Sequence, residues 1–269
     1  MKIAILDLYE GEPNEGMRCI QALIEQFKAS YSLPVSYEIF DVRSKLEAPD
    51  LSFDAYISSG GPGSPITSQG SDWELKYFTL MNGIIQHNRN NPHKRKHVLL
   101  ICHSFQIFCR YYNYAKVSKR KSTAFGVMPI HKTKEGVQEP LFAGLAEPFY
   151  AVDSRDYQIV EPNEGKIWSG GGHILCIEKD RPGIFLERAV MAIRFNEAII
   201  GMQFHAEVDS DGMHKYLLLD EKKRIVVEKH GEKKYFQMLQ FLNEREKIKL
   251  TYNTIVPNFL RAASLVAAQ

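Results

Sequence analysis

Short apolar runs alternate with longer amphipathic stretches from the first residues to about Tyr112, and this alternation constrains the fold more than any other feature of the sequence. An apolar run predicts a strand and an amphipathic stretch a helix, and repeated strand–helix units are typical of a parallel sheet with helices on both faces. The apolar runs predict strands at Lys2–Leu6, Val35–Phe40, Ala55–Ser58 and Val98–Ile101, and the amphipathic stretches predict helices at Asn14–Ser30, Asp72–His87 and His103–Tyr112.

The pattern changes after Tyr114, where short strand-like segments follow one another without long helices between them. These segments are Phe125–His131, Pro148–Val152, Lys166–Trp168, His173–Glu178, Ala189–Phe195 and Ala198–Gln203, and they indicate antiparallel pairing. From Asp209 onward the sequence is charged and helical in character, with helices predicted at Lys233–Lys247 and Asn258–Ala268. We therefore expect an α/β domain over residues 1–208 and a helical C-terminal extension, residues 209–269, packed on that domain.

The composition limits the class of protein. The formal net charge of +2 gives no tendency toward nucleic acid or an acidic membrane surface, and no apolar run approaches the ~18 residues of a membrane span. Four cysteines in 269 residues are too few for a disulfide-stapled secreted domain, and they form no C-x-x-C zinc pattern. The first residues do not resemble a secretory signal, so we expect a reducing, cytoplasmic location.

One cysteine has the sequence setting of an activated nucleophile. Cys102 falls where the strand ending at Ile101 passes into the next helix. A free thiol has a pKa of about 8.5, and a helix N-terminus lowers that value because its N–H groups favour the thiolate. His205 lies at the end of another predicted strand, and Glu207, two residues later, returns to the same side of an extended chain. These three residues predict a nucleophile, a base and a carboxylate that orients the base.

A glycine-rich loop should lie at the same edge of the sheet, because it follows the strand that ends at Ser58. Gly60, Gly61 and Gly63 allow close approach of the backbone, and a main-chain N–H of this loop could bind an oxyanion. The N–H of His103, at the start of the helix after Cys102, is a second candidate donor. Gln106 lies one helical turn beyond Cys102, within reach of the same site.

Three segments together resemble the class I glutamine amidotransferases, over about residues 1–208. The family's nucleophile segment, approximately G-[IV]-C-x-G-H-Q, corresponds to Leu100-Ile101-Cys102-His103-Ser104-Phe105-Gln106. Its histidine segment, G-x-Q-F-H-P-E, corresponds to Gly201-Met202-Gln203-Phe204-His205-Ala206-Glu207, and its S-G-G-P loop to Ser59-Gly60-Gly61-Pro62. The resemblance implies a flavodoxin-like three-layer sandwich with a central, mostly parallel sheet and additional antiparallel strands.

The resemblance also implies an activity. A family member hydrolyses the side-chain amide of glutamine through a cysteine thioester and passes the ammonia to an acceptor, here with Cys102, His205 and Glu207 as the triad. It implies glutamine or a related γ-glutamyl compound as substrate, possible partnership with a separate synthetase subunit, and neither a metal nor an organic cofactor. Ser154 lies in the segment that corresponds to the family's glutamine-binding Ser-His pair.

The sequence departs from the family pattern at the nucleophile and in the pocket. Leu100 and Ser104 replace the two glycines that flank the nucleophile, and the segment Val152–Asp156 contains no histidine. These departures leave two alternatives open. Besides a glutamine amidotransferase, the chain could be a non-catalytic relative that binds or regulates, or a cysteine-dependent acyltransferase or γ-glutamyl hydrolase.

Overall fold

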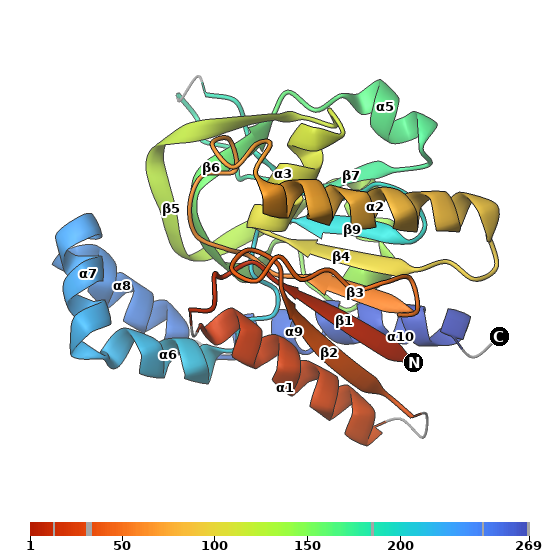
Figure 1. The fold of residues 1–269 in the computed structure, drawn as a ribbon. Helices are drawn as coiled ribbons and strands as arrows, with labels where there is room; N and C mark the ends of the chain where they lie inside the picture. The colour runs from red at the N-terminus through yellow and green to blue at the C-terminus, as the bar shows by residue number, and fades with distance from the viewer. Residues whose placement is uncertain (13, 31–33, 184–185, 244, 268–269) are drawn as a thin grey trace.

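The computed structural model describes residues 1–269 except 13, 31–33, 184–185, 244 and 268–269. Its described strands form one nine-stranded sheet in the order β2-β1-β3-β4-β9-β8-β7-β5-β6 (Figure 1). The first five strands in this order pair in parallel; they are β2 (Ser36–Asp41), β1 (Lys2–Asp7), β3 (Ala55–Ser58), β4 (His97–Ile101) and β9 (Ile199–Met202). Because parallel strands end at a common edge, the residues that follow β3, β4 and β9 lie close together.

Helices cover both faces of the parallel strands, and β1, β3, β4 and β9 are buried and apolar on both sides, whereas the edge strand β2 is largely exposed. On one face lie α1 (Glu15–Ser30) and, from the far end of the chain, α10 (Ile255–Ala267); on the other lie α2 (Asp72–Asn90) and α3 (His103–Tyr111) (Figure 1). Asn14 begins α1 as its N-cap, because its side-chain oxygen accepts the N–H of Met17 at 2.8 Å. The two helical layers enclose two separate apolar clusters, one on each face of the sheet.

The remaining strands pair in an antiparallel manner. They are β8 (Val190–Arg194), β7 (His173–Ile177), β5 (Lys116–Lys132) and β6 (Phe149–Val160). The expectation of an α/β fold is confirmed, but the sheet is mixed rather than mostly parallel, since half of its described pairings are antiparallel. β5 and β6 form a long curved ribbon with a register shift between Lys119 and Ala124, and this ribbon folds back over the edge where β4 ends (Figure 1).

One expected strand is a helix in the structure. The segment Lys166–Trp168 lies within α5 (Glu164–Ser169), and the side chain of Asn163 caps this helix by accepting the N–H of Lys166 at 3.1 Å. The apolar pair in this segment indicated a strand, but the asparagine before it and Gly170 after it are the start and stop signals of a short helix. Two further short elements, α4 (Lys134–Gln138) and the 3₁₀ turn η1 (Pro140–Phe142), connect β5 to β6.

The C-terminal segment is helical, and its described part packs in two places. The helices are α6 (Ser210–Leu218), α7 (Asp220–His230), α8 (Glu232–Asn243), α9 (Arg245–Tyr252) and α10. α6 and α8 pack with the β5–β6 ribbon around a small apolar cluster that includes Leu217 and Met238, whereas α10 joins the main core beneath the sheet. The division at residue 208 stays a prediction, and Ala268 of the expected final helix lies outside the described residues.

Candidate active site

Cys102 lies on a strained turn between β4 and α3. Its φ of 50° and ψ of −102° are unusual for a residue with a side chain, and such conformations cost about 1–3 kcal/mol. Two main-chain hydrogen bonds fix the turn: the Cys102 N–H donates to the carbonyl of Met202 at 2.8 Å, and the Cys102 carbonyl accepts the N–H of Gln106 at 3.0 Å. The strain therefore lies at the residue that the sequence marks as the nucleophile.

Ser104, which replaces a glycine of the family pattern, is built into this turn. Its side chain is fully buried. The Ser104 hydroxyl accepts the N–H of Ile101 at 2.8 Å and lies 2.9 Å from the carbonyl of Ser58 and 3.0 Å from that of Ile101. The serine thus links the ends of β3 and β4, and Leu100, at the other replaced glycine, packs in the core on the α2–α3 face.

His205 and Glu207 follow β9 and form a buried pair beside Cys102. The Nδ1 atom of His205 lies 2.8 Å from Oε1 of Glu207, and the side chain of Glu207 is almost completely buried. The N–H of His205 donates to the carbonyl of Val152 on β6 at 2.8 Å, which holds the turn after β9 against the ribbon. Gly16, in the first turn of α1, lies against the same carboxylate, because a Cβ placed there would be 3.2 Å from Glu207 Oε1.

The charges around His205 favour its protonated form. Burial lowers the pKa of His205, but the charges of Glu207 and Cys102, with the hydrogen bonds from both side chains, outweigh that effect and raise the pKa well above its usual value. A thiol next to an imidazole with a raised pKa can pass its proton to the ring and become a thiolate. The geometry of the three residues therefore fits a nucleophile, a base and a carboxylate that orients the base.

A chain of two amides also reaches the sulfur of Cys102. Gln203 is fully buried, and its Nε2 atom donates to Cys102 Sγ at 3.5 Å. The Nε2 atom of Gln106 donates to Oε1 of Gln203 at 3.0 Å and lies 3.2 Å from the carbonyl of Tyr157. Because Gln106 Nε2 binds the oxygen of the Gln203 amide, the nitrogen of that amide faces the sulfur. Sequence reasoning included Gln106 but missed Gln203, although it belongs to the matched histidine segment.

The glycine loop approaches the pair from the side of β3. A Cβ at Gly60 would lie 2.9 Å from Cε1 of His205, and a Cβ at Gly61 would lie 2.5 Å from the carbonyl oxygen of Leu8. Contacts below 3.0 Å would force a displacement, of the main chain of Leu8 at Gly61 and of the His205 ring at Gly60. Gly63 has a φ of +84°, which favours glycine at the tip of the loop.

His103 contributes only its backbone to the site. Its side chain is buried on the α2 side of the turn, with its ring centroid 6.3 Å from that of Trp73. Burial first, and the nearby Arg43 and Arg110 second, lower the pKa of His103 to about 3, so the ring is neutral at pH 7. Only its N–H, at the start of α3, remains a candidate for oxyanion binding.

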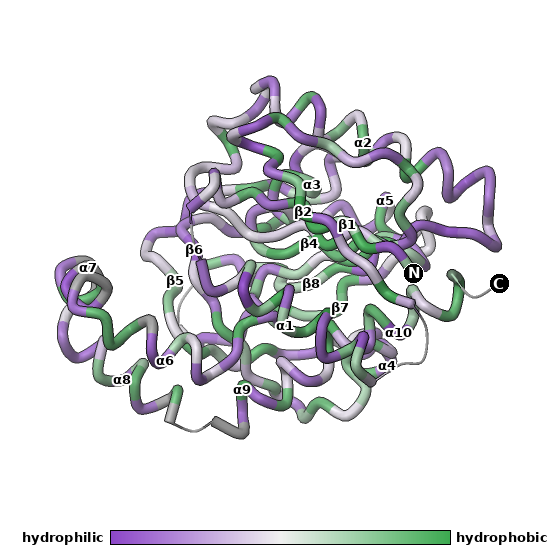
Figure 2. The backbone as a smooth tube through the Cα atoms, turned by 60° about the horizontal axis from the view of Figure 1, so that its bottom comes forward, coloured by the Kyte–Doolittle hydropathy of each residue, from purple (hydrophilic) through white to green (hydrophobic). Residues whose placement is uncertain are grey.

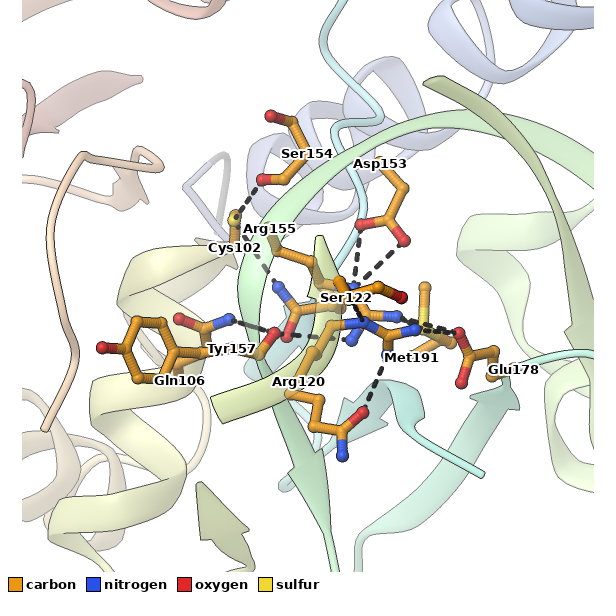
Figure 3. A network of polar contacts seen from close by, with 12 residues as sticks. Cys102, Gln106, Arg120, Ser122, Asp153, Ser154, Arg155, Tyr157, Glu178 and Met191 are labelled. Atoms are coloured by element: carbon orange, nitrogen blue, oxygen red, sulfur yellow. Dashed lines mark hydrogen bonds and ion pairs between the residues drawn. The ribbon is translucent and has the colours of Figure 1, made fainter. Parts of the chain in front are cut away.

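Ser154 lies on β6 directly beside the sulfur. Its carbonyl accepts a hydrogen bond from Cys102 Sγ at 3.8 Å, and its side chain is exposed (Figure 3). The contact joins the β5–β6 ribbon to the turn that carries Cys102.

A buried ionic network that sequence reasoning missed fixes this part of β6. Arg155 Nε lies 2.9 and 3.1 Å from the two carboxylate oxygens of Asp153, and Arg155 Nη2 lies 3.5 Å from Glu178 Oε1 (Figure 3). Arg120, from β5, binds the same glutamate at 2.9 Å. Burial raises the pKa of Glu178, but Arg120 and Arg155 outweigh it, so the pKa is lowered and the carboxylate is ionised at neutral pH. The network occupies the segment where the family pattern has its Ser-His pair.

The candidate residues surround a cleft of about 770 Å³. Seven of the nine predicted site residues line it: Gly61, Gly63, Cys102, His103, Gln106, Ser154 and His205. Gly60 lies behind the His205 ring, and Glu207 is buried behind the same ring. Its lining also includes the apolar residues Phe125, Val208, Met213 and Val226, together with the polar residues Thr123, Arg155 and Asp156 of the ribbon.

The described part of the chain offers neither a metal centre nor a membrane span. No group of three or more His, Cys, Asp or Glu side chains there is arranged to hold a metal ion. Within the same residues, no helix is both long and apolar enough to span a bilayer.

Comparison with known proteins gives one family and a set of similar folds. The family model for glutamine amidotransferase class-I matches residues 19–224, whereas no curated protein matches the chain. A glutamine amidotransferase from Thermotoga maritima is 16% identical, with a TM-score of 0.70 and 98% of each chain covered. A putative GMP synthase subunit from Thermoplasma acidophilum is 16% identical, with a TM-score of 0.56, and 100% of this chain and 96% of that chain are covered. The glutaminase domain of Trypanosoma brucei CTPS, with bound acivicin, is 14% identical, with a TM-score of 0.59, and the match covers 98% of this chain and 94% of that chain.

Proposed function

This chain belongs to the class I glutamine amidotransferase family, and we propose that it is an enzyme that hydrolyses a glutamine-type amide through a thioester at Cys102. The observation that carries the proposal is the buried His205–Glu207 pair beside a cysteine on a strained strand–helix turn. A cysteine that only packs in the core would need neither a neighbouring histidine with a raised pKa nor a positive φ, and Cys102 has both.

The proposed reaction has two halves. In the first, the Cys102 thiolate attacks the amide carbonyl, and main-chain N–H groups near Gly61 and His103 stabilise the oxyanion. His205, as imidazolium, donates its proton to the departing nitrogen, so that ammonia leaves and a γ-thioester forms. In the second, His205 removes a proton from water, the hydroxide attacks the thioester, and the carboxylic acid product leaves as Cys102 is restored. Glu207 holds the ring orientation throughout.

The ammonia released in the first half needs an acceptor. Because the similar structures include a CTPS glutaminase domain and a putative GMP synthase subunit, we propose a separate synthetase as the partner that takes up the ammonia. The expected flavodoxin-like arrangement belongs to the same proposal, as does a reducing, cytoplasmic location, which the four free cysteines support. Neither a metal nor an organic cofactor is needed for the proposed steps.

A second candidate is hydrolysis of a larger γ-glutamyl amide. The cleft of about 770 Å³ falls in the size range of sites for drug-sized ligands, about 300–1,000 Å³, and exceeds what one amino acid occupies. The apolar residues of its lining, Phe125, Val208, Met213 and Val226, would suit an apolar group on the amide nitrogen. In this case an amine rather than ammonia would leave in the first half of the reaction.

Turnover assays separate these candidates. The full chain is incubated with glutamine and with γ-glutamyl amides of increasing apolar size, and glutamate, ammonia and free amine are measured against a Cys102→Ala control. Ammonia release from glutamine supports the first candidate, and preferential release of apolar amines supports the second. Transfer of the γ-glutamyl group to an added amine would indicate an acyltransferase. Turnover by none of the substrates would contradict the proposal and favour a binding or regulatory role. Turnover that survives in Cys102→Ala would contradict the assignment of Cys102 as the nucleophile.

A further inference from the structure

Arg43 connects two loops that border the cleft at Cys102. It lies in the turn after β2, and its side chain is only 10% exposed. Its Nη1 atom donates to the carbonyl of Pro62, in the glycine loop, at 2.7 Å and to the carbonyl of Leu8, in the loop after β1, at 3.2 Å. One nitrogen atom therefore holds the main chain of both loops.

The other atoms of the guanidinium group are held unevenly. Nη2 forms an ion pair with Glu10, in the same loop as Leu8, at 2.6 Å. The Arg43 Cζ atom lies 5.1 Å from the centre of the Trp73 ring, on α2, in a cation–π contact. Nε is buried and has no hydrogen-bond partner within the described chain. Because a buried cation with an unpaired donor costs stability, packing alone gives no reason for an arginine here.

The contact with Pro62 fixes the direction of a peptide group. The peptide that joins Pro62 to Gly63 is trans, so its N–H, that of Gly63, points away from Arg43. Within the part of the chain that the structure describes, this N–H donates to no acceptor, and Gly63 lines the cleft. Arg43 thus orients a peptide at the cleft whose donor is not used inside the chain.

The two loops also contact each other directly at Leu8. A Cβ at Gly61 would lie 2.5 Å from the carbonyl oxygen of Leu8, which is the oxygen that Arg43 binds. The N–H of Leu8 donates to the buried hydroxyl of Ser59 at 2.9 Å. That hydroxyl in turn donates to the carbonyl of Gly60 at 2.8 Å. Arg43 therefore completes a set of contacts that joins the loop after β1 to the glycine loop.

We propose that Arg43 is a positioning residue, which holds the glycine loop against the loop after β1 so that the main-chain N–H groups of Gly61 and Gly63 stay directed at the cleft. Arg43 is not among the residues that line the cleft, so it acts through the loop. Without it, the Pro62 carbonyl loses its donor, and the flexible Gly63 would allow that peptide to turn. The inference rests on the reaction proposed above, in which the glycine loop binds the oxyanion.

Arg43→Met tests this role, because methionine keeps an unbranched apolar stem but has none of the N–H donors. Arg194→Met is the matched control. Arg194 is the last residue of β8, which lies beside β7 (Figure 2), and it is not among the residues that line the cleft at Cys102. Its contacts are of the same kind, because it pairs with Glu139 and lies 3.4 and 3.3 Å from the carbonyls of Asn196 and Glu197.

Turnover, alkylation and hydrogen exchange are measured for both variants and for the unaltered chain. For Arg43→Met we expect kcat to fall at least about tenfold, since removal of a whole oxyanion donor costs about 10²- to 10³-fold. Alkylation of Cys102 by iodoacetamide should stay within about twofold, because this displacement needs the thiolate but forms no oxyanion. The buried N–H of Leu8 should exchange with deuterium at least about tenfold faster, because a charged hydrogen bond no longer holds the loops together. Arg194→Met should change none of the three.

An unchanged kcat in Arg43→Met would overturn the inference, and so would unchanged exchange at Leu8. Equal losses of turnover and of alkylation would also overturn it, because they would show a general loss of structure, as would the same changes in Arg194→Met. If the unaltered chain turns over none of the substrates, the proposed function fails, whereas the exchange comparison still decides whether Arg43 holds the two loops.

If Arg43→Met does not fold, Arg43→Lys replaces it in the experiment. Lysine keeps the charge, but its ammonium group lies one bond short of the Nη1 position and cannot reproduce the planar guanidinium contacts. We then expect kcat to fall at least about threefold with alkylation of Cys102 unchanged. Full activity of Arg43→Lys would overturn the inference.

Discussion

Replacement of Ser104 by alanine tests how the turn at Cys102 is held without the glycines of the family pattern. The Ser104 hydroxyl accepts the N–H of Ile101 at 2.8 Å and donates to one of two carbonyl groups, at 2.9 Å from Ser58 or 3.0 Å from Ile101. The hydroxyl therefore makes two hydrogen bonds at one time, and the substitution removes both, each worth about 1 kcal/mol net. Because Ser104 is fully buried, water cannot replace them.

We expect Ser104→Ala to lower the free energy of unfolding by about 2 kcal/mol, since alanine keeps the Cβ and introduces no clash. For a chain of this size, that loss corresponds to a decrease of the melting temperature of roughly 4–8 °C. Ser104→Gly should lose a further 0.5–1 kcal/mol, approximately, because glycine is more flexible in the unfolded chain. Denaturant titration and thermal melting of the full chain measure both values.

Ser30→Ala provides the matched control for this experiment. The Ser30 hydroxyl also bonds a main-chain carbonyl, that of Gln26 at 2.9 Å, but it is exposed at the end of α1, so a change within about 0.5 kcal/mol is expected. A loss at Ser104→Ala no larger than that of the control would refute the reasoning. Full stability of Ser104→Gly would refute it as well, because the serine would then be dispensable to the turn.

Three further predictions concern the chemistry. Glu207→Gln removes the main charge that raises the pKa of His205. Since His205 must be protonated to release the leaving group, the alkaline limb of the kcat/KM profile should move to lower pH. The rate should also fall about 10²- to 10⁴-fold. An alkaline limb that stays in place would contradict the assignment. Gln203→Leu removes the N–H donor to Cys102 Sγ and should slow alkylation of that thiol by iodoacetamide about tenfold or more; an unchanged rate would exclude this role. Gly60→Ala places a Cβ 2.9 Å from the His205 ring, so turnover should fall more than tenfold. Circular dichroism should show little loss of secondary structure. Full activity would contradict the prediction, because it would show that the loop can move to accept the methyl group.

The central parallel strands could be predicted because their residues are buried on both faces. The runs at Ala55–Ser58 and Val98–Ile101 are continuously apolar, and β3 and β4 begin and end within one residue of the predicted bounds. The β5–β6 ribbon was harder to predict. β5 begins at Lys116, nine residues before the predicted strand, because its first part is basic, largely exposed and without apolar alternation.

Some residues of the candidate site could likewise be predicted from the sequence, and others could not. Matched motifs placed Cys102, His205 and Glu207 in the same region, since each follows a strand whose position was clear from its apolar run. Gln203 was missed because its contact with Cys102 joins positions 101 residues apart, and no spacing rule predicts such a contact. The pairing of Arg155 with Glu178 was missed for a similar reason, because it joins β6 to the residue that follows β7.

The central claim is that His205 activates Cys102 as a nucleophile toward a glutamine-type carbonyl. Its most direct test is mass mapping after exposure of the full chain to a diazoketone analogue of glutamine, with the rate of adduct formation compared in His205→Ala. The account predicts one adduct, on Cys102, which lines the cleft, with labelling slowed at least tenfold in the variant. Cys19, Cys109 and Cys176 should stay unmodified, because all three are completely buried and lie outside the cleft. An adduct on another cysteine, no adduct, or an unchanged rate without the histidine would contradict it.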